Sequence, residues 1–288
     1  MKGWLLGVWV TPVMALSVQD DAGRTVTLPH VPQRIISLAP HATELLFEVG
    51  AGAQVVGVSA WSDYPAAARS KVQIGGIDAL DIERIQALHP DLVVAWQSGN
   101  RASDVSQLQR LGLPVYYSEI QRVDALPDAL RRLGQLTGHD QAGAQKARQV
   151  AQGWATLQQR YARRAPVTVF YQVWSSPLMT VSGKQFIGDA IARCGGVNPF
   201  ARLPGLTPTV GVEDVLLAKP QLLVTSTPDG QPDGSLQDWA RWPTLPAVAR
   251  KQYLYLRADW LSRPTPRLLW GIRQLCEGIE RTRQQSDH

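Results

Sequence analysis

Short apolar runs alternate with segments of helical periodicity along most of the chain. The continuous apolar runs predict strands that are buried on both faces, and the amphipathic segments between them predict helices. Strands and helices that alternate in this way are typical of an α/β fold with a largely parallel sheet. Ahead of them, 18–33 reads as a short hairpin. The predicted buried strands are 34–38, 55–58, 92–95, 115–117, 167–173, 222–226 and 252–256.

One segment in the middle of the chain, 139–164, is longer than the others and polar except for a single stripe. Asp140 can cap its start and Pro166 stops it. A helix of this length spans roughly 35–40 Å, comparable to a small domain. Gly143 and Gly153 each cost it about 1 kcal/mol against alanine, so it needs packing partners. Its stripe recurs at helical spacing through Ala147, Val150, Trp154, Leu157 and Tyr161.

The pattern before this segment is repeated after it. DIERIQALHPDLVVAW at 81–96 and GVEDVLLAKPQLLVTS at 211–226 each read as a helix, a proline and a strand. Equivalent residues lie 130 positions apart, an offset too long for a solenoid repeat. They are Glu83 and Glu213, Pro90 and Pro220, and Leu92 and Leu222.

The repeat predicts the domain organisation. We expect an α/β protein with two similar Rossmann-like lobes, 18–138 and 166–288, each with a largely parallel sheet. One long spanning helix, 139–165, joins them. A continuous helix resists bending, so we expect only small movements of one lobe against the other.

The N-terminus has the features of a secretory signal peptide. Lys2 precedes the apolar run 4–10, and small residues suit cleavage just before Val18. No later segment approaches 18 consecutive apolar residues. We expect 1–17 to be removed and the mature chain to be an exported, soluble protein, with a poorly cleaved anchor as the alternative.

Charge and cysteine content say little about the function of the protein. The formal charge is +5 before Lys2 is removed, and the basic residues are dispersed, which does not favour a nucleic-acid partner. Two cysteines, Cys194 and Cys276, remain in the mature chain. An oxidising compartment favours a disulfide over two free thiols, and that disulfide would constrain only the second lobe.

Motifs of catalysis are missing from the sequence. It contains no Gly-x-Ser-x-Gly elbow, no Walker loop and no Gly-x-Gly-x-x-Gly turn. Its five histidines are scattered without zinc-ligand spacing. We therefore expect no enzyme activity, no resident metal and no cofactor.

Aromatic residues gather instead where predicted strands end. Trp61, Tyr64, Trp96, Trp174 and Trp260 lie at or just beyond those ends. In open α/β sheets, ligands bind in the crevice outside the carboxyl ends of the strands. Two such crevices facing each other would form one cleft with aromatic walls. We expect it to bind a large, flat, partly apolar ligand, although packing into a core is the alternative for any single tryptophan.

The same stretches carry a family likeness. RIISLAPHATE, SAWSDYP, LDIERIQALHPDLVVAWQSGN, CGGVNPF and RADWLSRPTPR are similar to segments of the periplasmic cobalamin-binding proteins of ABC importers, which belong to the helical-backbone class of substrate-binding proteins. The resemblance covers nearly the whole mature chain. It implies a monomeric periplasmic receptor that captures cobalamin or a related corrinoid between its lobes and delivers it to an importer.

The resemblance also implies roles for single residues. Trp61 and Trp96 match ligand-contacting aromatics, and Trp174 joins them as a strand-end tryptophan. The segment Asp259, Trp260, Leu261, Ser262 and Arg263 matches a second ligand-contacting loop, in which Asp259 and Arg263 are polar handles for corrin amides.

Outside the cleft, the resemblance assigns three more features. Glu83 and Glu213 match two glutamates, one per lobe, that dock onto arginines of the permease dimer in the inner membrane; solvated glutamates at helix starts are the alternative. Cys194 and Cys276 match a disulfide of the second lobe.

Two positions depart from the family pattern. Ile77 stands near where the family can carry a further tryptophan. His41 stands where a small residue is usual, in the predicted loop 39–44 ahead of a helix at 45–49. It is either an exposed loop histidine at the cleft lip or an axial ligand to the metal of a bound tetrapyrrole.

Other functions on this scaffold stay open. A haem or ferric-siderophore receptor would use the same cleft, with His41 or Tyr64 on the iron. A secreted enzyme or a partner-binding protein is the alternative from another class. The sequence does not indicate which corrinoid would be preferred.

Overall fold

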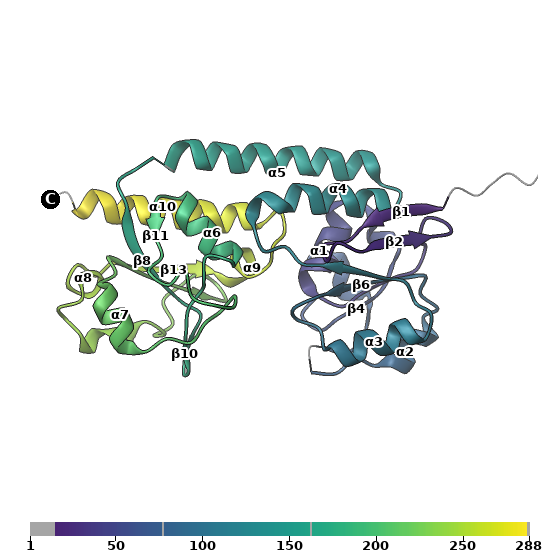
Figure 1. Cartoon of the computed structure of the whole chain (residues 1–288), viewed down its shortest axis with the longest axis horizontal. Coiled ribbons are helices and arrows are strands. Elements are labelled where there is room, and N and C mark those ends of the chain that lie inside the picture. Colours follow the sequence, from purple (N-terminus) through teal and green to yellow (C-terminus); the bar gives the residue numbers. More distant parts are fainter. Residues whose placement is uncertain (1–14, 77, 162, 287–288) are drawn as a thin grey trace, which may run out of the picture.

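The computed structural model describes residues 15–76, 78–161 and 163–286. Two lobes lie side by side, and α5 (Asp140–Tyr161) runs along one side of both (Figure 1). Each lobe contains one parallel sheet, so the predicted α/β fold of two lobes joined by a long helix is confirmed. The predicted signal peptide, 1–17, lies outside the described residues except for its last three positions.

The N-terminal lobe is built on a five-stranded parallel sheet with the order β5-β4-β3-β6-β7. Alternate residues of its strands enter two different cores; Ile35 packs in one and Ile36 in the other, so the sheet is covered on both faces. An antiparallel hairpin precedes it, β1 (Leu16–Gln19) and β2 (Thr25–Leu28). The sheet strands are β3 (Ile35–Ser37), β4 (Val55–Val58), β5 (Val72–Gln73), β6 (Leu92–Trp96) and β7 (Val115–Ser118). The helices are α1 (Pro40–Glu48), α2 (Ile82–Ala87), α3 (Ala102–Arg110) and α4 (Leu126–Leu136), with 3-10 turns η1 (Ala51–Ala53), η2 (Ala66–Ser70) and η3 (Val123–Ala125).

The C-terminal lobe repeats this plan on a four-stranded parallel sheet with the order β11-β8-β12-β13. A small antiparallel hairpin, β9 with β10, projects from it on the side opposite α5 (Figure 1). The strands are β8 (Val167–Gln172), β9 (Trp174–Ser175), β10 (Leu178–Met179), β11 (Gly196–Val197), β12 (Leu222–Thr227) and β13 (Tyr253–Arg257). The helices are α6 (Phe186–Arg193), α7 (Val212–Ala218), α8 (Pro246–Ala249), α9 (Ala258–Leu261) and α10 (Leu268–Ser286), with the 3-10 turn η4 (Gln237–Arg241).

The spanning helix belongs to both cores. The predicted stripe is buried along its whole length. Ala147 and Val150 pack into the N-terminal core, whereas Trp154, Leu157 and Tyr161 pack into the C-terminal core. Leu269 of α10 touches both. Because burying such side chains stabilises each lobe, α5 fixes the distance between them.

The internal repeat is visible in the backbone. Glu83 and Glu213 lie in the first turns of α2 and α7, and both are exposed. A residue with positive φ follows each helix: His89, two residues after α2, has φ 45°, and Lys219, directly after α7, has φ 46°. The next residue is in both cases a buried proline. The 130-residue offset therefore marks one local structure used twice.

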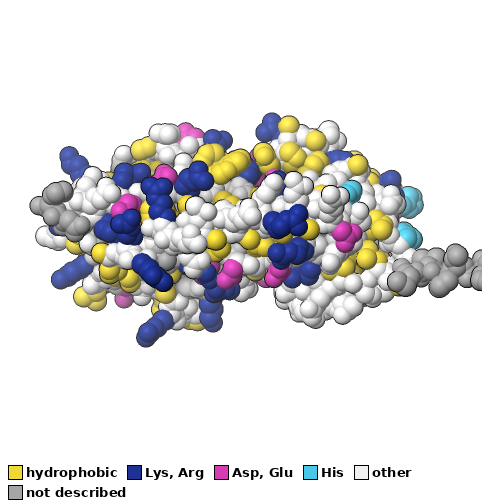
Figure 2. Space-filling model, turned by 90° about the horizontal axis from the view of Figure 1, so that it is seen from above, with side chains coloured by type: hydrophobic (Ala, Val, Ile, Leu, Met, Phe, Trp, Pro, Cys, Tyr) yellow, Lys and Arg dark blue, Asp and Glu magenta, His cyan; other side chains and the backbone are white. Residues whose placement is uncertain are grey.

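Both copies of this unit lie on the same side of the molecule. Figure 1 shows α2 and α7 at the outer ends of their lobes, on the side opposite α5. Seen from the α5 side, Lys and Arg side chains are spread over both lobes, with Asp and Glu between them (Figure 2).

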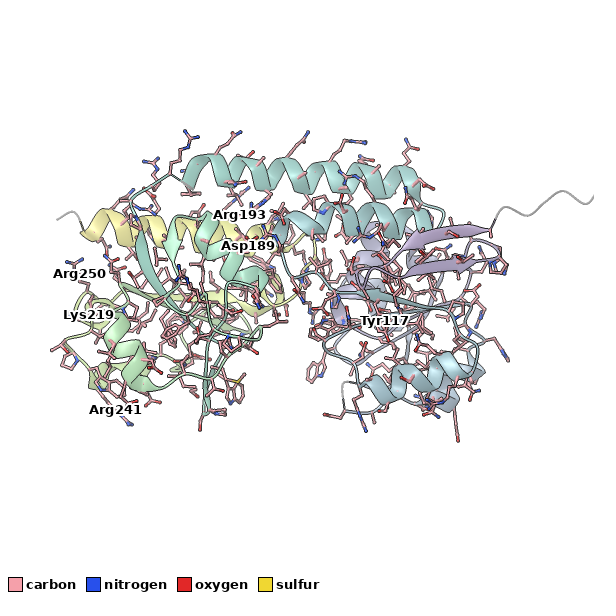
Figure 3. The ribbon with its side chains drawn as sticks, viewed as in Figure 1. Tyr117, Asp189, Arg193, Lys219, Arg241 and Arg250 are labelled. Atoms are coloured by element: carbon pink, nitrogen blue, oxygen red, sulfur yellow. A yellow bond between two sulfur atoms is a disulfide. The ribbon has the colours of Figure 1, made fainter. Side chains whose placement is uncertain are left out.

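Ion pairs between the lobes add to the shared helix. Asp189 of α6 is buried; it accepts from the Nε of Arg193 at 2.8 Å and from the backbone N–H of Val123 at 3.4 Å. Asp124, next to Val123 in the N-terminal lobe, pairs with Arg193 Nη2 at 2.8 Å. Figure 3 shows Asp189 and Arg193 on α6, beneath α5 near the junction of the lobes.

The disulfide joins Cys194, at the end of α6, to Cys276 in α10, with Cα atoms 4.9 Å apart. Both residues belong to the C-terminal lobe, so it constrains that lobe alone, as the sequence predicts. No helix within the described residues is long and apolar enough to cross a membrane.

Two predicted loops are wrong. Helix α1 begins at Pro40, five residues before the predicted start, because proline suits the first helical turn, where its missing N–H costs nothing. His41 is therefore a helical residue. Part of the predicted loop 259–263 is the single helical turn α9.

Glycine at position 143 allows α5 to lie close against α4. A Cβ there would stand 2.7 Å from the carbonyl O of Leu130 and 2.9 Å from the Cα of Gly134. We expect Gly143→Ala to lower the free energy of unfolding by about 1–3 kcal/mol, because overpacking outweighs the roughly 1 kcal/mol gained in helix propensity. Denaturant unfolding measures this difference.

Gly153→Ala is the matched control in the same helix. Its Cβ would meet the end of the Leu269 side chain at 2.8 Å, which can move aside. We expect this variant to be as stable as the wild type or slightly more stable. Equal destabilisation by both substitutions would contradict close backbone packing at Gly143.

Candidate functional site

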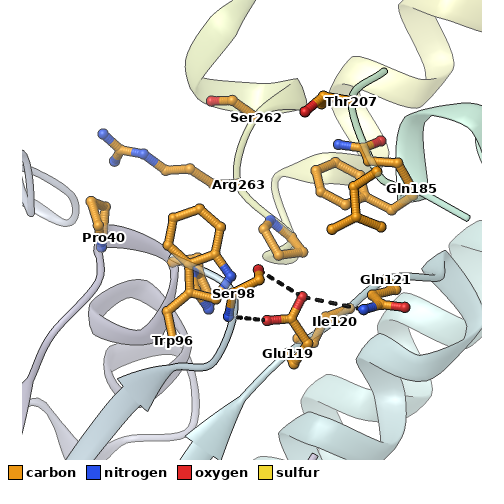
Figure 4. A pocket seen from close by; sticks show the side chains of 14 residues that line it. Pro40, Trp96, Ser98, Glu119, Ile120, Gln121, Gln185, Thr207, Ser262 and Arg263 are labelled. Carbon is orange, nitrogen blue, oxygen red and sulfur yellow. Dashed lines mark hydrogen bonds between the residues drawn. The ribbon is translucent and has the colours of Figure 1, made fainter. Parts of the chain in front are cut away.

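A cavity of about 460 Å³ lies between the lobes. Its N-terminal wall consists of Pro40 and His41 from α1, Trp96 and Ser98 after β6, and Glu119, Ile120 and Gln121 after β7. Its C-terminal wall consists of Gln185, Phe186, Leu206, Thr207, Ser262, Arg263 and Pro264. The N-terminal wall thus lies beyond the carboxyl ends of two neighbouring parallel strands, the usual place for a ligand in such sheets. Figure 4 shows the side chains of both walls facing each other.

Trp96 stands at the end of β6, and the residues after it hold its indole in place. A Cβ on Gly99 would lie 1.9 Å from Cε3 of the indole, so only glycine leaves room for the ring. The Oδ1 of Asn100 accepts from the backbone N–H of Trp96 at 2.6 Å, and the Nδ2 of Asn100 donates to the carbonyl O of Leu38 at 2.9 Å. The sequence AW-x-x-GN therefore sets the direction of one aromatic wall.

Polar groups beside Trp96 are ordered by Glu119. Its carboxylate accepts from the N–H of Ser98 at 2.9 Å, from the Ser98 Oγ at 3.0 Å and from the Nε2 of Gln121 at 3.5 Å (Figure 4). Gln185 and Thr207 face them from the other lobe (Figure 4). Amides and hydroxyls can donate to and accept from the amide groups of a ligand, and the carboxylate can accept from them.

His41 belongs to the buried part of this wall and does not lie at an exposed lip. It is 4% exposed, its Nε2 is 3.2 Å from the Oγ of Ser118, and its ring meets Trp96 edge-on at 5.4 Å between centroids. Burial, and secondly the charge of Arg263, lower its pKa from 6.5 to about 4. The exposed-loop interpretation is wrong. An axial bond from Nε2 to a metal would have to replace the bond to Ser118.

Trp61 stands over a second cavity, of about 370 Å³, which shares Pro40 and Trp96 with the first. Its side chain is 80% exposed, and its backbone has φ 65°, a left-handed conformation that is rare for a bulky residue. The two tryptophans predicted for the N-terminal lobe thus lie at adjoining cavities. Ile77 lies outside the described residues.

The predicted segment 259–263 divides between three environments. Ser262 and Arg263 line the cavity between the lobes. Asp259 and Trp260 line a separate cavity of about 360 Å³, together with Tyr64 and Arg267. Leu261 is fully buried in the C-terminal core. Leu261 is therefore a core residue in this structure, because the one-turn helix α9 turns its side chain inward.

Trp174 lies apart from these cavities. It is 61% exposed in the β9–β10 hairpin, and its indole Nε1 donates to the carbonyl O of Ser176 at 2.9 Å. Its role in ligand binding stays a prediction.

One cluster of charges crosses the junction beside the cavity. Glu44 of α1 is buried and pairs with Arg263 at 2.9 Å and with Arg267 through both of its carboxylate oxygens. Arg263 Nη1 also reaches the carboxylate of Asp63 at 2.8 Å. Partial burial alone would raise the pKa of Asp63, but the hydrogen bond and charge of Arg263 outweigh it and lower that pKa. The Arg267 guanidinium also lies 3.9 Å over the ring of Tyr64.

Among the residues that the structure describes, no three His, Cys, Asp or Glu side chains are grouped so that they could hold a metal ion. The arrangement is one of aromatic faces and polar side chains between two lobes. The sequence was compared with models of known protein families. The family model described as periplasmic binding protein matches residues 35–260. The chain belongs to the periplasmic binding protein family.

The chain is similar in sequence to vitamin B12-binding proteins of other bacteria. The vitamin B12-binding protein of Vibrio parahaemolyticus is 35% identical over 263 residues, which cover 91% of this chain and 94% of the relative. That of Yersinia pestis is 37% identical over 253 residues, 88% of each chain.

The fold is also similar to that of solved structures. The periplasmic vitamin B12-binding protein BtuF of Vibrio cholerae superimposes with a TM-score of 0.80 at 34% identity, covering 88% of this chain and 98% of the other. The periplasmic heme-binding protein RhuT from Roseiflexus, at 23% identity and a TM-score of 0.73, shares the fold.

Sequence reasoning missed part of the site. Ser98, Glu119 and Gln121 follow strand ends, so the rule that predicts Trp96 could have found them. Gln185 is the residue directly before α6, and Thr207 lies in a long irregular segment; neither carries a motif. Glu44 lies at the end of the predicted loop 39–44, and nothing nearby in the sequence indicates its partners.

Burial of His41 makes stability depend on pH. Its pKa is about 4 in the folded protein, against 6.5 when it is exposed. Between these values the unfolded chain binds a proton that the folded protein does not, so stability falls as pH drops from 6.5 towards 4, by about 3 kcal/mol in all. We expect His41→Gln to remove this part of the pH dependence in denaturant unfolding at pH 7, 5.5 and 4.5.

The exposed His30 provides the control. We expect His30→Gln to follow the wild-type pH dependence. A His41→Gln curve parallel to the wild type over this range would show that His41 titrates normally in the folded protein.

Proposed function

We propose that the protein is a periplasmic receptor that captures cobalamin or a related corrinoid between its lobes and presents it to an ABC importer, without chemical change to the ligand. The observation that carries this proposal is the cavity between the lobes, with Trp96 and a set of amide and hydroxyl side chains on its walls. It occurs in a chain that is 35–37% identical to vitamin B12-binding proteins over about 90% of its length.

Corrinoids suit this cavity chemically. A corrin ring has broad apolar faces and a rim of acetamide and propionamide groups. Trp61 and Trp96 offer aromatic faces on one lobe, where a flat ring can pack. Gln121, Gln185 and Thr207 can exchange hydrogen bonds with rim amides from both lobes. The adjoining cavity beneath Trp61 offers room for a ligand larger than the cavity between the lobes.

Delivery to a transporter is supported by the repeated helices. Glu83 and Glu213 are exposed in equivalent first turns, on α2 and α7, and these helices lie opposite α5 (Figure 1). Two equivalent carboxylates on one side suit a partner with two-fold symmetry. The partner we propose is the permease dimer of an ABC importer, contacted through its basic residues.

Ligand binding tests the first part. In isothermal titration with cyanocobalamin, cobinamide and haem, we expect both corrinoids to bind the wild-type protein. Trp96→Ala should weaken binding by about 2 kcal/mol or more, roughly 30-fold, because it removes a large apolar face from the cavity wall. Trp242→Ala removes a half-buried indole from the C-terminal lobe, away from the cavity, and should leave the affinity unchanged.

Two results of this titration would count against the proposal. Absence of heat with either corrinoid would refute corrinoid binding. Haem binding without corrinoid binding would assign the protein to haem uptake.

Transport tests the second part. Uptake is measured with the cognate importer in vesicles. We expect the double variant Glu83→Ala/Glu213→Ala to bind the importer at least about tenfold more weakly, since a close interfacial charge pair contributes roughly 1.5 kcal/mol or more. Its corrinoid uptake should fall accordingly. Its corrinoid affinity should not change. The control, Asp128→Ala/Glu277→Ala, removes one carboxylate from α4 and one from α10, beneath α5, and should retain full uptake. Equal uptake by both double variants would contradict docking through the glutamates.

A further inference from the structure

Arg263 makes its strong contacts with the other lobe. Its Nη1 donates to Glu44 at 2.9 Å and to Asp63 at 2.8 Å, and its Nη2 donates to the carbonyl O of Trp61 at 3.0 Å. All three acceptors belong to the N-terminal lobe. In Figure 4 the guanidinium extends away from Gln185 and Thr207. A role as a polar handle for the ligand would require it to leave these partners.

The loop that receives Arg263 carries the most exposed tryptophan of the cleft. The indole of Trp61 is 80% exposed, so its own packing does little to fix it. Its backbone is held in the left-handed region, which side chains rarely adopt without support. Within its lobe, the neighbours of Trp61 are held on both sides: the N–H of Ala60 donates to the carbonyl O of Gly75 at 2.7 Å, and the Oγ of Ser62 accepts from the hydroxyl of Thr43 at 3.1 Å. The carbonyl O of Trp61 itself is bound from across the junction, by Arg263.

Arg263 is itself held in place. The side chain of Glu44 is fully buried, and Arg267 pairs with it from the same lobe as Arg263. A buried carboxylate needs such partners to remain charged. The side chain of Arg263 is only 13% exposed. One guanidinium therefore connects a fixed anchor, Glu44, to the backbone carbonyl of Trp61.

We propose that Arg263 is a positioning residue for Trp61: from the C-terminal lobe it holds the Trp61 loop of the N-terminal lobe, and so sets where the indole stands at the cleft. Ligand affinity then depends on Arg263 through Trp61 and not through a direct bond to the ligand. This dependence on a ligand rests on the proposed function. The positioning itself does not.

The first experiment needs no ligand. The protein is labelled with 5-fluorotryptophan, and the ¹⁹F resonance of Trp61 is assigned by its loss in Trp61→Phe. We expect Arg263→Ala to shift or broaden that resonance. Arg257→Ala is the matched control, because Arg257 stands just before the same helical turn and lies over Trp260 in its own lobe. It should leave the Trp61 resonance where it is in the wild type.

The second experiment is a double-mutant cycle with cyanocobalamin. We expect Trp61→Ala and Arg263→Ala each to weaken binding by about tenfold, and the double variant to be no weaker than Trp61→Ala within about twofold. Arg263→Lys keeps the charge opposite Glu44 but lacks the second arm that reaches the carbonyl O of Trp61. It should behave like Arg263→Ala in both experiments, and it serves as the test should Arg263→Ala fold poorly.

Each result decides between the two roles. An unchanged Trp61 resonance in Arg263→Ala and Arg263→Lys would overturn the proposal. Losses of affinity that add in the double variant would also overturn it, since they would mean that Arg263 acts on the ligand directly. If the wild type bound no corrinoid, the proposed function would fail and the ¹⁹F experiment alone would decide whether Arg263 positions Trp61.

Discussion

The buried carboxylate of Glu44 is the interaction on which the junction of the lobes depends. It lies on α1 of one lobe, and both of its arginine partners, Arg263 and Arg267, come from the other. A charge taken out of water needs its partners, and removing one partner of a buried pair costs about 3–5 kcal/mol. Moving the lobes apart would break the ion pairs of Glu44 with both arginines and expose the three charges to water. These pairs therefore favour the lobe separation at which they form. The cavity between them lies directly beside this contact and shares Arg263 with it.

Two further contacts restrain the same junction. Helix α5 enters both hydrophobic cores, so bending it would expose apolar surface in each lobe. Asp189 and Arg193 connect α6 of the C-terminal lobe to the turn η3 of the N-terminal lobe. Together these contacts hold the walls apart and facing each other before any ligand arrives. A site formed in advance loses little entropy when a rigid, flat ligand enters, which favours tight binding.

Local patterns in the sequence predict much of this architecture. Apolar runs gave the central strands of both sheets, and the stripe of 139–164 gave α5 with its buried face. The strand-end rule found Trp96, which does line the cavity. It did not find the contacts that depend on distant parts of the chain. Glu44 and Arg263 are 219 residues apart, and their pairing follows only from how the lobes sit. For the same reason His41 was expected in an exposed loop, whereas Ser118 and Trp96 cover it. Leu261 is predicted to bind the ligand because it lies within the segment 259–263. In the structure the helical turn α9 directs its side chain into the core.

The two copies of the repeated unit resemble each other on the outside and differ at the cleft. Glu83 and Glu213, the residues with positive φ that follow their helices and the buried prolines after them have all kept equivalent positions. At the strand ends the equivalence is lost, since Trp96 faces the cavity, whereas its counterpart Ser226 bonds the hydroxyl of Tyr171. A partner with two-fold symmetry requires the outer surfaces to match. A ligand without that symmetry requires the inner surfaces to differ. The repeat therefore matches on its outer face and differs at its strand ends. A receptor that carries an asymmetric ligand to a symmetric transporter needs both properties.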